Sequence, residues 1–150
     1  MLKSKSDDKA PKSPPGKLML SEIQEQPEAI ARLLERECQP VWEMAKPWRE
    51  TPPRFIFIAA RGTSDHAALF AKYLFETMNG IPVGLASPSI ASIYRAKVNM
   101  EGALIVGISQ SGEAADVISV IHAAKQDGVS TLAINNAVSP KLAAAAPQAI

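Results

Sequence analysis

The sequence predicts an α/β fold, in which helices cover both faces of a doubly wound, parallel sheet. Short apolar runs, the first of them FIFIAA at Phe55, alternate with stretches of helical periodicity. Continuous apolar runs are typical of strands that are buried on both faces, and their alternation with helices predicts right-handed crossovers. The chain has 150 residues, 47% of them hydrophobic, which is enough for one domain with a core of its own.

The first third of the chain is predicted to be helical, after a disordered tail. Residues 1–17 are rich in Lys, Ser and Pro and nearly devoid of apolar side chains, so we expect them to form the tail. Residues 18–53 are expected to form an N-terminal helical segment. Its main helix is predicted to begin at Pro27, since the first turn tolerates proline, and to end at Cys38, ahead of Pro40.

The remaining residues, 54–150, are predicted to form the α/β domain. Strands are expected at the apolar runs 55–60, 82–86, 103–108 and 131–134. Helices are expected between and after them, at 64–78, 88–94, 113–126 and 141–146. A fifth strand would start where the chain ends, so we expect this domain to be truncated at its C-terminal end.

Composition argues against several classes of function. A net charge of +1 gives no electrostatic footprint for nucleic acid or for an anionic membrane surface. No apolar run approaches the roughly 20 residues of a membrane-spanning helix. The one cysteine, Cys38, leaves no internal disulfide and no Cys/His metal spacing. We therefore expect a cytoplasmic protein, and no metal or organic cofactor is implied.

The clearest chemical signal follows the first expected strand, at Gly62, Thr63 and Ser64. Doubly wound sheets bind ligands at the carboxyl ends of their strands. A helix N-terminus there offers unpaired N–H groups, glycine lets a ligand approach the backbone, and two hydroxyls can donate to an anion. Ser and Thr are also the ordinary caps of any helix, so capping is the alternative for this turn.

The turn after the third expected strand, Ser109-Gln110-Ser111-Gly112, repeats this arrangement with two hydroxyls and a side-chain amide. Both turns should lie at the same edge of a parallel sheet and face one crevice. Backbone N–H groups and hydroxyls can then hold a phosphate without Lys or Arg. Capping by Ser109 and Ser111 stays open as the alternative.

Other phosphate and hydrolase motifs are missing. The sequence has neither GxxxxGK[ST] nor GxGxxG. The run from Gly107 to Ser111 lacks the last glycine of a GxSxG elbow, and His122 lies on the helix that leaves the same turn, where it cannot act as a base. A structural role is at least as well supported as a chemical one for the charged residues near the crevice, which are Arg61, Asp65, His66, Glu113 and Asp116.

At these two turns the chain resembles the SIS (sugar isomerase) family. ARGTSDHAALFAKYLFE, GISQSGEAADVI and the upstream EIQEQPEAI look like the first SIS subdomain of two-subdomain amino-sugar enzymes, over about residues 18–150. The resemblance implies a flavodoxin-like, three-layer αβα fold. It further implies that the sugar phosphate is bound by Gly62, Thr63, Ser64, Ser109, Gln110 and Ser111. The family often has threonine at the position of Ala114.

The resemblance implies the N-terminal half of an amino-sugar-phosphate isomerase or deaminase, of the glucosamine 6-phosphate and fructose 6-phosphate class. Such chemistry needs a base beside the substrate carbonyl and an acid or cation to stabilise the enediolate. In two-subdomain members these groups come mainly from the second subdomain, so we identify no catalytic residue here. The family also implies a homodimer with its site near a subunit or subdomain boundary.

Two alternatives remain. One is a regulatory SIS domain that senses a sugar phosphate, although the residues before Phe55 are too few and too broken by proline for the helix-turn-helix domain that usually precedes it. The other is the isomerase part of a glutamine-fructose-6-phosphate aminotransferase. Glutamine-dependent synthesis itself is not expected, because the chain begins with Met1 instead of a nucleophilic cysteine. The RGTSDH form of the first turn looks more like deaminase-type or stand-alone members.

Overall fold

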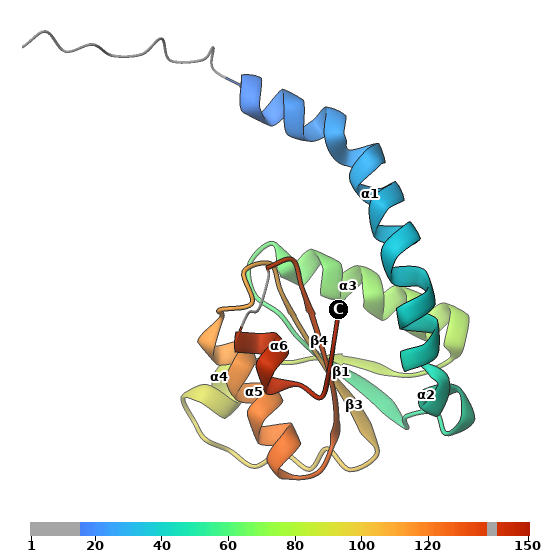
Figure 1. The fold of residues 1–150 in the computed structure, drawn as a ribbon. Coiled ribbons are helices and arrows are strands. Elements are labelled where there is room, and N and C mark those ends of the chain that lie inside the picture. Colours follow the sequence, from blue (N-terminus) through green and yellow to red (C-terminus); the bar gives the residue numbers. More distant parts are fainter. Residues whose placement is uncertain (1–15, 138–140) are drawn as a thin grey trace, which may run out of the picture. The chain divides into compact units, whose positions relative to one another are not determined.

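The structure is a computed structural model that describes residues 16–137 and 141–150 (Figure 1). The chain divides into two compact units, Met1–Pro40 and Val41–Ile150, and each is described by itself. The disordered tail expected at the start of the chain lies, except for its last two residues, outside the described residues.

Helix α1 (Lys17–Met44) is longer than the sequence predicts and contains both Pro27 and Pro40. The prediction that these prolines begin and end the helix is therefore wrong. A proline inside a helix leaves the carbonyl four residues earlier without its N–H partner. The residues concerned, Ile23 and Arg36, are both exposed, so water can hydrate these carbonyls and the helix continues.

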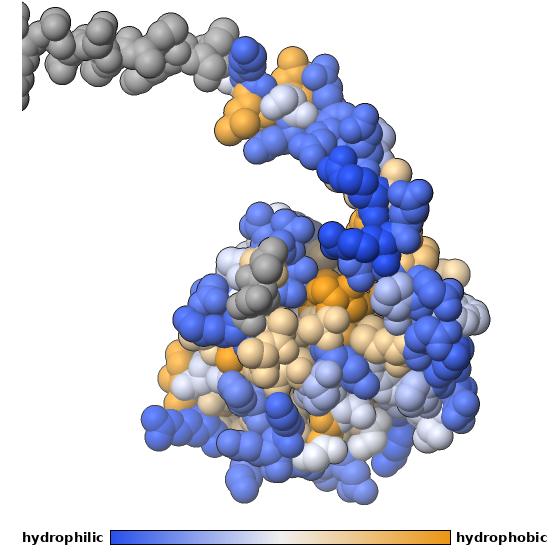
Figure 2. All heavy atoms as spheres, viewed as in Figure 1, coloured by the Kyte–Doolittle hydropathy of each residue, from blue (hydrophilic) through white to orange (hydrophobic). Residues whose placement is uncertain are grey.

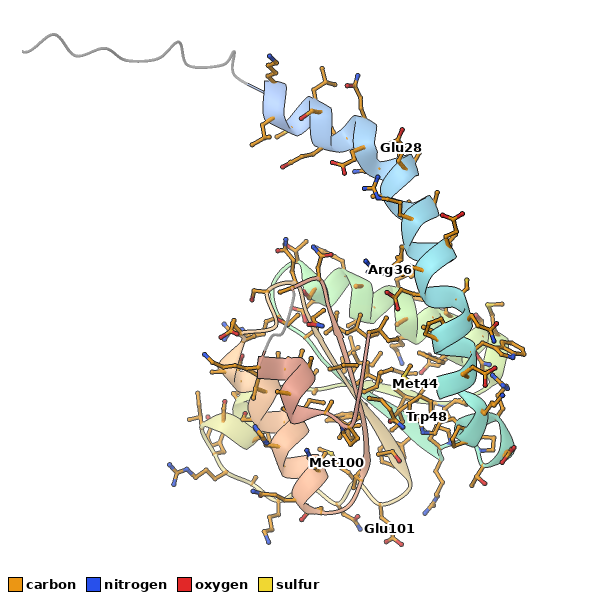
Figure 3. The ribbon with its side chains drawn as sticks, in the orientation of Figure 1. Glu28, Arg36, Met44, Trp48, Met100 and Glu101 are labelled. Atoms are coloured by element: carbon orange, nitrogen blue, oxygen red, sulfur yellow. The ribbon has the colours of Figure 1, made fainter. Side chains whose placement is uncertain are left out.

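The second unit begins within the last turn of α1 and continues through the short helix α2 (Lys46–Glu50). Met44 and Trp48 are partly buried against one face of the sheet that follows. Figure 3 labels both residues at the C-terminal end of this helical region. The end of the N-terminal helical segment thus belongs to the core of the α/β unit.

Five parallel strands form one sheet in the order β2-β1-β3-β4-β5. This confirms the doubly wound α/β fold. The strands are β1 (Phe55–Ala59), β2 (Val83–Leu85), β3 (Ala103–Ser109), β4 (Ser130–Asn135) and β5 (Gln148–Ala149). The chain runs outward from β1 to β2 and then returns to the other side of β1 with β3, so the strand order reverses between β1 and β3. Open α/β sheets bind their ligands at such a switch point.

Helices cover both faces of this sheet, as Figure 1 shows. The helical elements are α3 (Ser64–Leu74) with its π-helical extension η1 (Phe75–Asn79), α4 (Ser89–Ser92), α5 (Ala115–Gln126) and α6 (Lys141–Ala145). Helix α3 packs on one face, whereas α4, α5 and α6 lie on the other. In Figure 2 apolar residues gather on the surface where Figure 1 places α6 and the C-terminal end of the chain.

Strand β3 is the centre of the core, and all seven of its residues are buried. Its side chains alternate between the two faces, so Ile105 packs with Val117 and Ile121 of α5 while Val106 packs on the α3 side with Ala68. A strand that is buried along its whole length is fixed in position by both helical layers. The turn that follows β3 therefore starts from a rigid point.

Gly107 on β3 gives the helices of one layer room to approach the sheet. A Cβ atom at this position would lie 3.0 Å from Cγ1 of Ile121 and 3.2 Å from Cδ1 of Leu142, and both side chains are completely buried. We expect Gly107→Ala to lower the free energy of unfolding by about 1–3 kcal/mol in urea titrations, because neither neighbour can move into solvent. A Gly107→Ala variant as stable as the wild type would contradict the expectation.

Candidate functional site

The turns that follow β1 and β3 enclose a hollow of about 530 Å³ at the carboxyl edge of the sheet. Its walls include most of the residues that the sequence singled out, namely Thr63, Ser64, Ser109, Gln110 and Ser111, together with Arg61 and Ala114. Gly62 does not line the hollow. The expectation that both turns face a common crevice is thus met by the geometry, and we call this space the two-turn hollow.

The first turn bends the chain from β1 directly into α3. Gly62 has a φ of 61°, a left-handed conformation that glycine adopts without steric cost. The N–H of Ser64 donates to the carbonyl of Arg61 at 3.3 Å, and the N–H of Asp65 donates to the carbonyl of Gly62 at 3.0 Å. These bonds start the helix immediately, so the hydroxyls of Thr63 and Ser64 lie at its N-terminal end.

The second turn is held by bonds from within and from two other segments. The N–H of Gly112 donates to the carbonyl of Ser109 at 3.1 Å, with Gly112 at a φ of 66°. The carbonyl of Gly112 accepts from the N–H of Leu142 at 3.0 Å, and the carbonyl of Gln110 accepts from the N–H of Asn136 at 3.2 Å. Because both partners come from elsewhere in the fold, the turn has its shape before a ligand arrives.

Helix capping does not account for the serines of the second turn. Helix α5 begins at Ala115 with Ala114 in the N-cap position, so the alternative that Ser109 and Ser111 cap this helix is wrong. Thr63 is the N-cap residue of α3 but makes no side-chain capping bond. The hydroxyl of Ser111 accepts the N–H of Glu113 at 3.3 Å, which leaves its proton free for a ligand.

Other donors around the two-turn hollow are unused within the part of the chain that the structure describes. The hydroxyls of Thr63, Ser64 and Ser109 have no hydrogen-bond partner there, although Ser109 is only 6% exposed. Because all three residues line the two-turn hollow, water or a ligand there can be the partner of these hydroxyls. An oxyanion in the two-turn hollow would supply one.

Arg61 and Asp116 join the two turns by an ion pair. The distance from Nη1 of Arg61 to Oδ2 of Asp116 is 2.7 Å, and the residues lie 55 positions apart in the sequence. Arg61 also lines the two-turn hollow. In the sequence, the one feature that pointed to Arg61 was its position directly after β1. That position does not show which carboxylate its guanidinium contacts.

The remaining charged candidates lie outside the two-turn hollow. Asp65 and His66 are exposed on the first turn of α3 and do not line it. Glu113 pairs with Lys141 of α6, with Oε2 and Nζ 2.7 Å apart. The hydrogen bond from Lys141 lowers the pKa of Glu113, and the same bond raises the pKa of Lys141. This pair connects the second turn to α6.

The Glu113–Lys141 pair predicts a dependence of stability on pH. Since the pKa of Glu113 is lowered in the folded state, the stabilisation is present above its ordinary value of 4.5 and is lost as the pH falls through the lowered value. The pKa of Lys141 is raised, so its contribution is lost only as the pH rises beyond 10.5. We expect Lys141→Met to be slightly less stable than wild type in urea at neutral pH, a difference that shrinks below pH 4.5 and is lost once the pH has fallen through the lowered pKa of Glu113.

The matched control for this experiment is Lys125→Met, which removes an exposed lysine of α5 to which the described residues supply no carboxylate partner. It should show no pH-dependent difference of this kind. A stability difference for Lys141→Met that persisted unchanged in acid would rule out the ion pair as its cause.

Two further findings concern the described residues alone. None of their helices is long and apolar enough to cross a membrane. They also contain no group of three or more His, Cys, Asp or Glu side chains placed to bind a metal ion.

Comparison with known families identifies this architecture. The SIS domain family matches residues 52–150. The chain belongs to the SIS domain family. The family resemblance inferred from the two turns is thereby confirmed.

Curated relatives of this SIS chain include aminotransferases. The glutamine-fructose-6-phosphate aminotransferase of Halobacterium salinarum is 33% identical over 97% of this chain and 25% of that protein. The enzyme of the same name from Bradyrhizobium diazoefficiens is 35% identical over 83% of this chain and 21% of that protein. The SIS chain therefore spans about a quarter of the length of the curated relatives it matches.

Solved structures support the same family assignment. A candidate phosphosugar isomerase from Silicibacter pomeroyi superposes with a TM-score of 0.84 and 36% identity, over 88% of this chain and 40% of that one. The C-terminal domain of glucosamine-fructose-6-phosphate aminotransferase from Francisella tularensis gives a TM-score of 0.71 and 30% identity, over 93% and 40%. The chain thus resembles both a phosphosugar isomerase and the C-terminal domain of the aminotransferase.

Proposed function

We propose that this SIS domain binds a sugar phosphate whose phosphate group sits in the two-turn hollow. The observation that carries the proposal is the convergence of hydroxyls from two turns that are far apart in the sequence, at the point where the strand order reverses. Helix N-termini and free hydroxyls stabilise anions, and this site presents both. In this proposal, Gly62 allows the phosphate to approach the backbone of the first turn.

In this proposal each residue of the two turns has its own role. Ser109 and Ser111 donate hydroxyl protons from the second turn, and Thr63 and Ser64 donate from the first. The side-chain amide of Gln110 supplies a further donor. Arg61 adds positive charge at the rim, where it already neutralises Asp116. A phosphate in this position serves as a binding handle and holds the sugar ring away from the turns.

We further propose that the chain contributes to an isomerase or deaminase acting on glucosamine 6-phosphate or fructose 6-phosphate. The names of the relatives support this class, and the isomerase part of an aminotransferase has the same requirement for a bound sugar phosphate. The walls of the two-turn hollow contain no carboxylate or imidazole among the described residues. The base that moves the proton beside the carbonyl would therefore come from another subdomain or subunit.

Calorimetric titration with glucosamine 6-phosphate, fructose 6-phosphate and the two unphosphorylated sugars tests the proposal. We expect the phosphorylated sugars to bind at least about a hundredfold more tightly, because charge-assisted hydrogen bonds contribute roughly 1.5–3 kcal/mol each. Equal affinity for the phosphorylated and free sugars would overturn it. Turnover of glucosamine 6-phosphate by this chain alone, followed by the release of ammonia or by formation of the ketose, would contradict the proposed origin of the base outside this chain.

We also propose a cytoplasmic homodimer with the site near its boundary. Exposed apolar side chains on α3 and η1 support the association, since Phe70, Tyr73 and Met78 are 66%, 63% and 76% exposed. The free and exposed thiol of Cys38 suits a reducing compartment. Sedimentation equilibrium of the wild type and of Phe70→Ser tests the dimer, and a wild type that stays monomeric at all concentrations would exclude it.

A further inference from the structure

A second cavity lies on the sheet face that α5 covers, away from the two turns. It has a volume of about 350 Å³ and lies between α4, the segment 93–100 and the C-terminal half of α5. Figure 1 shows α4 and the segment after it beside α5, and Figure 3 labels Met100 near the end of that segment. No wall residue is shared with the two-turn hollow. We call this space the α4–α5 cavity.

The inner walls of the α4–α5 cavity are apolar. Phe57 of β1, Met100 and Val120 of α5 form the larger surfaces, and Val120 is only 3% exposed. Much of the remaining wall is made of small side chains, including Ala91 and Ala123, so a ring or branched chain can reach the inner surface. Its volume lies within the range of about 300–1,000 Å³ that is typical of small-molecule sites.

Charged groups also line this cavity. Arg95 and Lys97 come from the segment opposite α5, and Asp127 follows the end of that helix. All three residues are exposed, and no carboxylate among the described residues pairs with either cation. Two positive charges and one negative charge leave a net positive lining. An anionic group on a ligand would be attracted there, while its apolar part is buried against Phe57 and Val120.

The backbone of the cationic segment is held in an unusual conformation. Arg95 has a φ of 50° and is the one non-glycine residue with a positive φ in the described part of the chain. The segment folds back on α4 through hydrogen bonds from the N–H of Tyr94 to the carbonyl of Ser89 and from the N–H of Ala96 to the carbonyl of Ile90, both at 3.1 Å. Strained residues that are held by their surroundings gather at ligand sites.

We propose that the α4–α5 cavity binds a small organic anion, which has an apolar aromatic or branched body and one acidic group. The apolar walls bury the body, and Arg95 and Lys97 pair with the acid. This site is independent of the sugar-phosphate proposal, because the two share no residue. Its ligand differs in kind, since a sugar phosphate has too little apolar surface for these walls.

Titration with 1-anilinonaphthalene-8-sulfonate, an aromatic sulfonate whose fluorescence rises in apolar surroundings, tests the site. We expect saturable binding of one probe per chain. Ala123→Phe places a ring into the cavity and should abolish this signal. His122→Phe is the matched control, since it adds the same ring one position earlier on α5 at an exposed residue that does not line the cavity.

The charge requirement has its own test. Arg95→Gln with Lys97→Gln should weaken the binding of the sulfonate roughly three- to tenfold, as expected for exposed ion pairs. The neutral probe N-phenyl-1-naphthylamine should bind both proteins equally. Ala96→Trp, which fills the cavity from the opposite wall, serves as the second filling variant if circular dichroism shows that Ala123→Phe does not fold.

Three results would overturn the proposal. One is saturable probe binding that survives both filling variants. Another is loss of binding in Phe70→Ser, which would place the probe on the exposed face of α3. The third is displacement of the probe by inorganic phosphate together with loss of binding in Ser109→Ala/Ser111→Ala, which would place it in the two-turn hollow.

Discussion

Replacing Ser109 and Ser111 together by alanine is expected to weaken the binding of glucosamine 6-phosphate by about 10²- to 10⁴-fold. A hydrogen bond to a charged group contributes roughly 1.5–3 kcal/mol, and each 1.4 kcal/mol is a factor of about ten in affinity. Both hydroxyls line the two-turn hollow, and neither is used to cap α5. The loss should therefore appear in the affinity for the phosphate group and not in the affinity for the sugar ring.

Calorimetry with glucosamine 6-phosphate and with glucosamine measures this difference directly. The matched control is Ser130→Ala, which removes an exposed hydroxyl at the amino end of β4, at the opposite edge of the sheet. It should leave both affinities unchanged. The double variant should lose little stability in urea, because Ser109 has no side-chain partner among the described residues and Ser111 loses only the 3.3 Å bond from the N–H of Glu113. A loss of less than about fivefold in phosphate-dependent binding would contradict the assigned roles.

The α/β unit was predictable because its pattern is local and strong. The run at β1 is apolar at every position, and the run at β3 has no polar side chain before Ser109. Such runs specify strands that are covered by helices on both faces. Helices were expected to end at residues 78 and 126, and Gly80 and Gly128, with φ values of 65° and 72°, follow the observed ends of α3–η1 and α5. The course of α1 was not predictable in the same way. Prolines are typical of helix ends, so they predicted boundaries at Pro27 and Pro40. Because α1 is exposed, water hydrates the carbonyls that lose their N–H partners, and the helix continues.

The residues of the two turns could be predicted from the sequence, but the contacts between distant segments could not. Motif spacing placed Thr63, Ser64 and the second turn at one edge of the sheet, and the structure brings their side chains around one hollow. The Arg61–Asp116 pair depends on the distance between two turns 55 residues apart, which no local pattern specifies. The α4–α5 cavity depends likewise on how the segment around Arg95 folds back, which its sequence does not reveal.

Ala114→Thr is expected to strengthen the binding of glucosamine 6-phosphate by about ten- to a hundredfold. Ala114 lines the two-turn hollow and is the N-cap residue of α5, with an extended backbone at φ −64° and ψ 101° and no side-chain capping bond. A threonine fits this conformation, and its hydroxyl can accept an N–H of the first helical turn while it donates its proton to the phosphate. One added bond to a charged group accounts for the expected gain.

The variant Ala114→Val separates the hydroxyl from the shape of the side chain, because valine has the same branching as threonine and no polar atom. Calorimetry should show the gain in phosphate-dependent affinity for Ala114→Thr alone. Urea unfolding without ligand should show Ala114→Thr about 0.5–1 kcal/mol more stable than Ala114→Val, since the hydroxyl also caps α5. If both variants bound glucosamine 6-phosphate equally, position 114 would lie outside the reach of the phosphate. The phosphate would then have to bind nearer to the first turn and Arg61, which makes this one substitution a test of where in the two-turn hollow the phosphate sits.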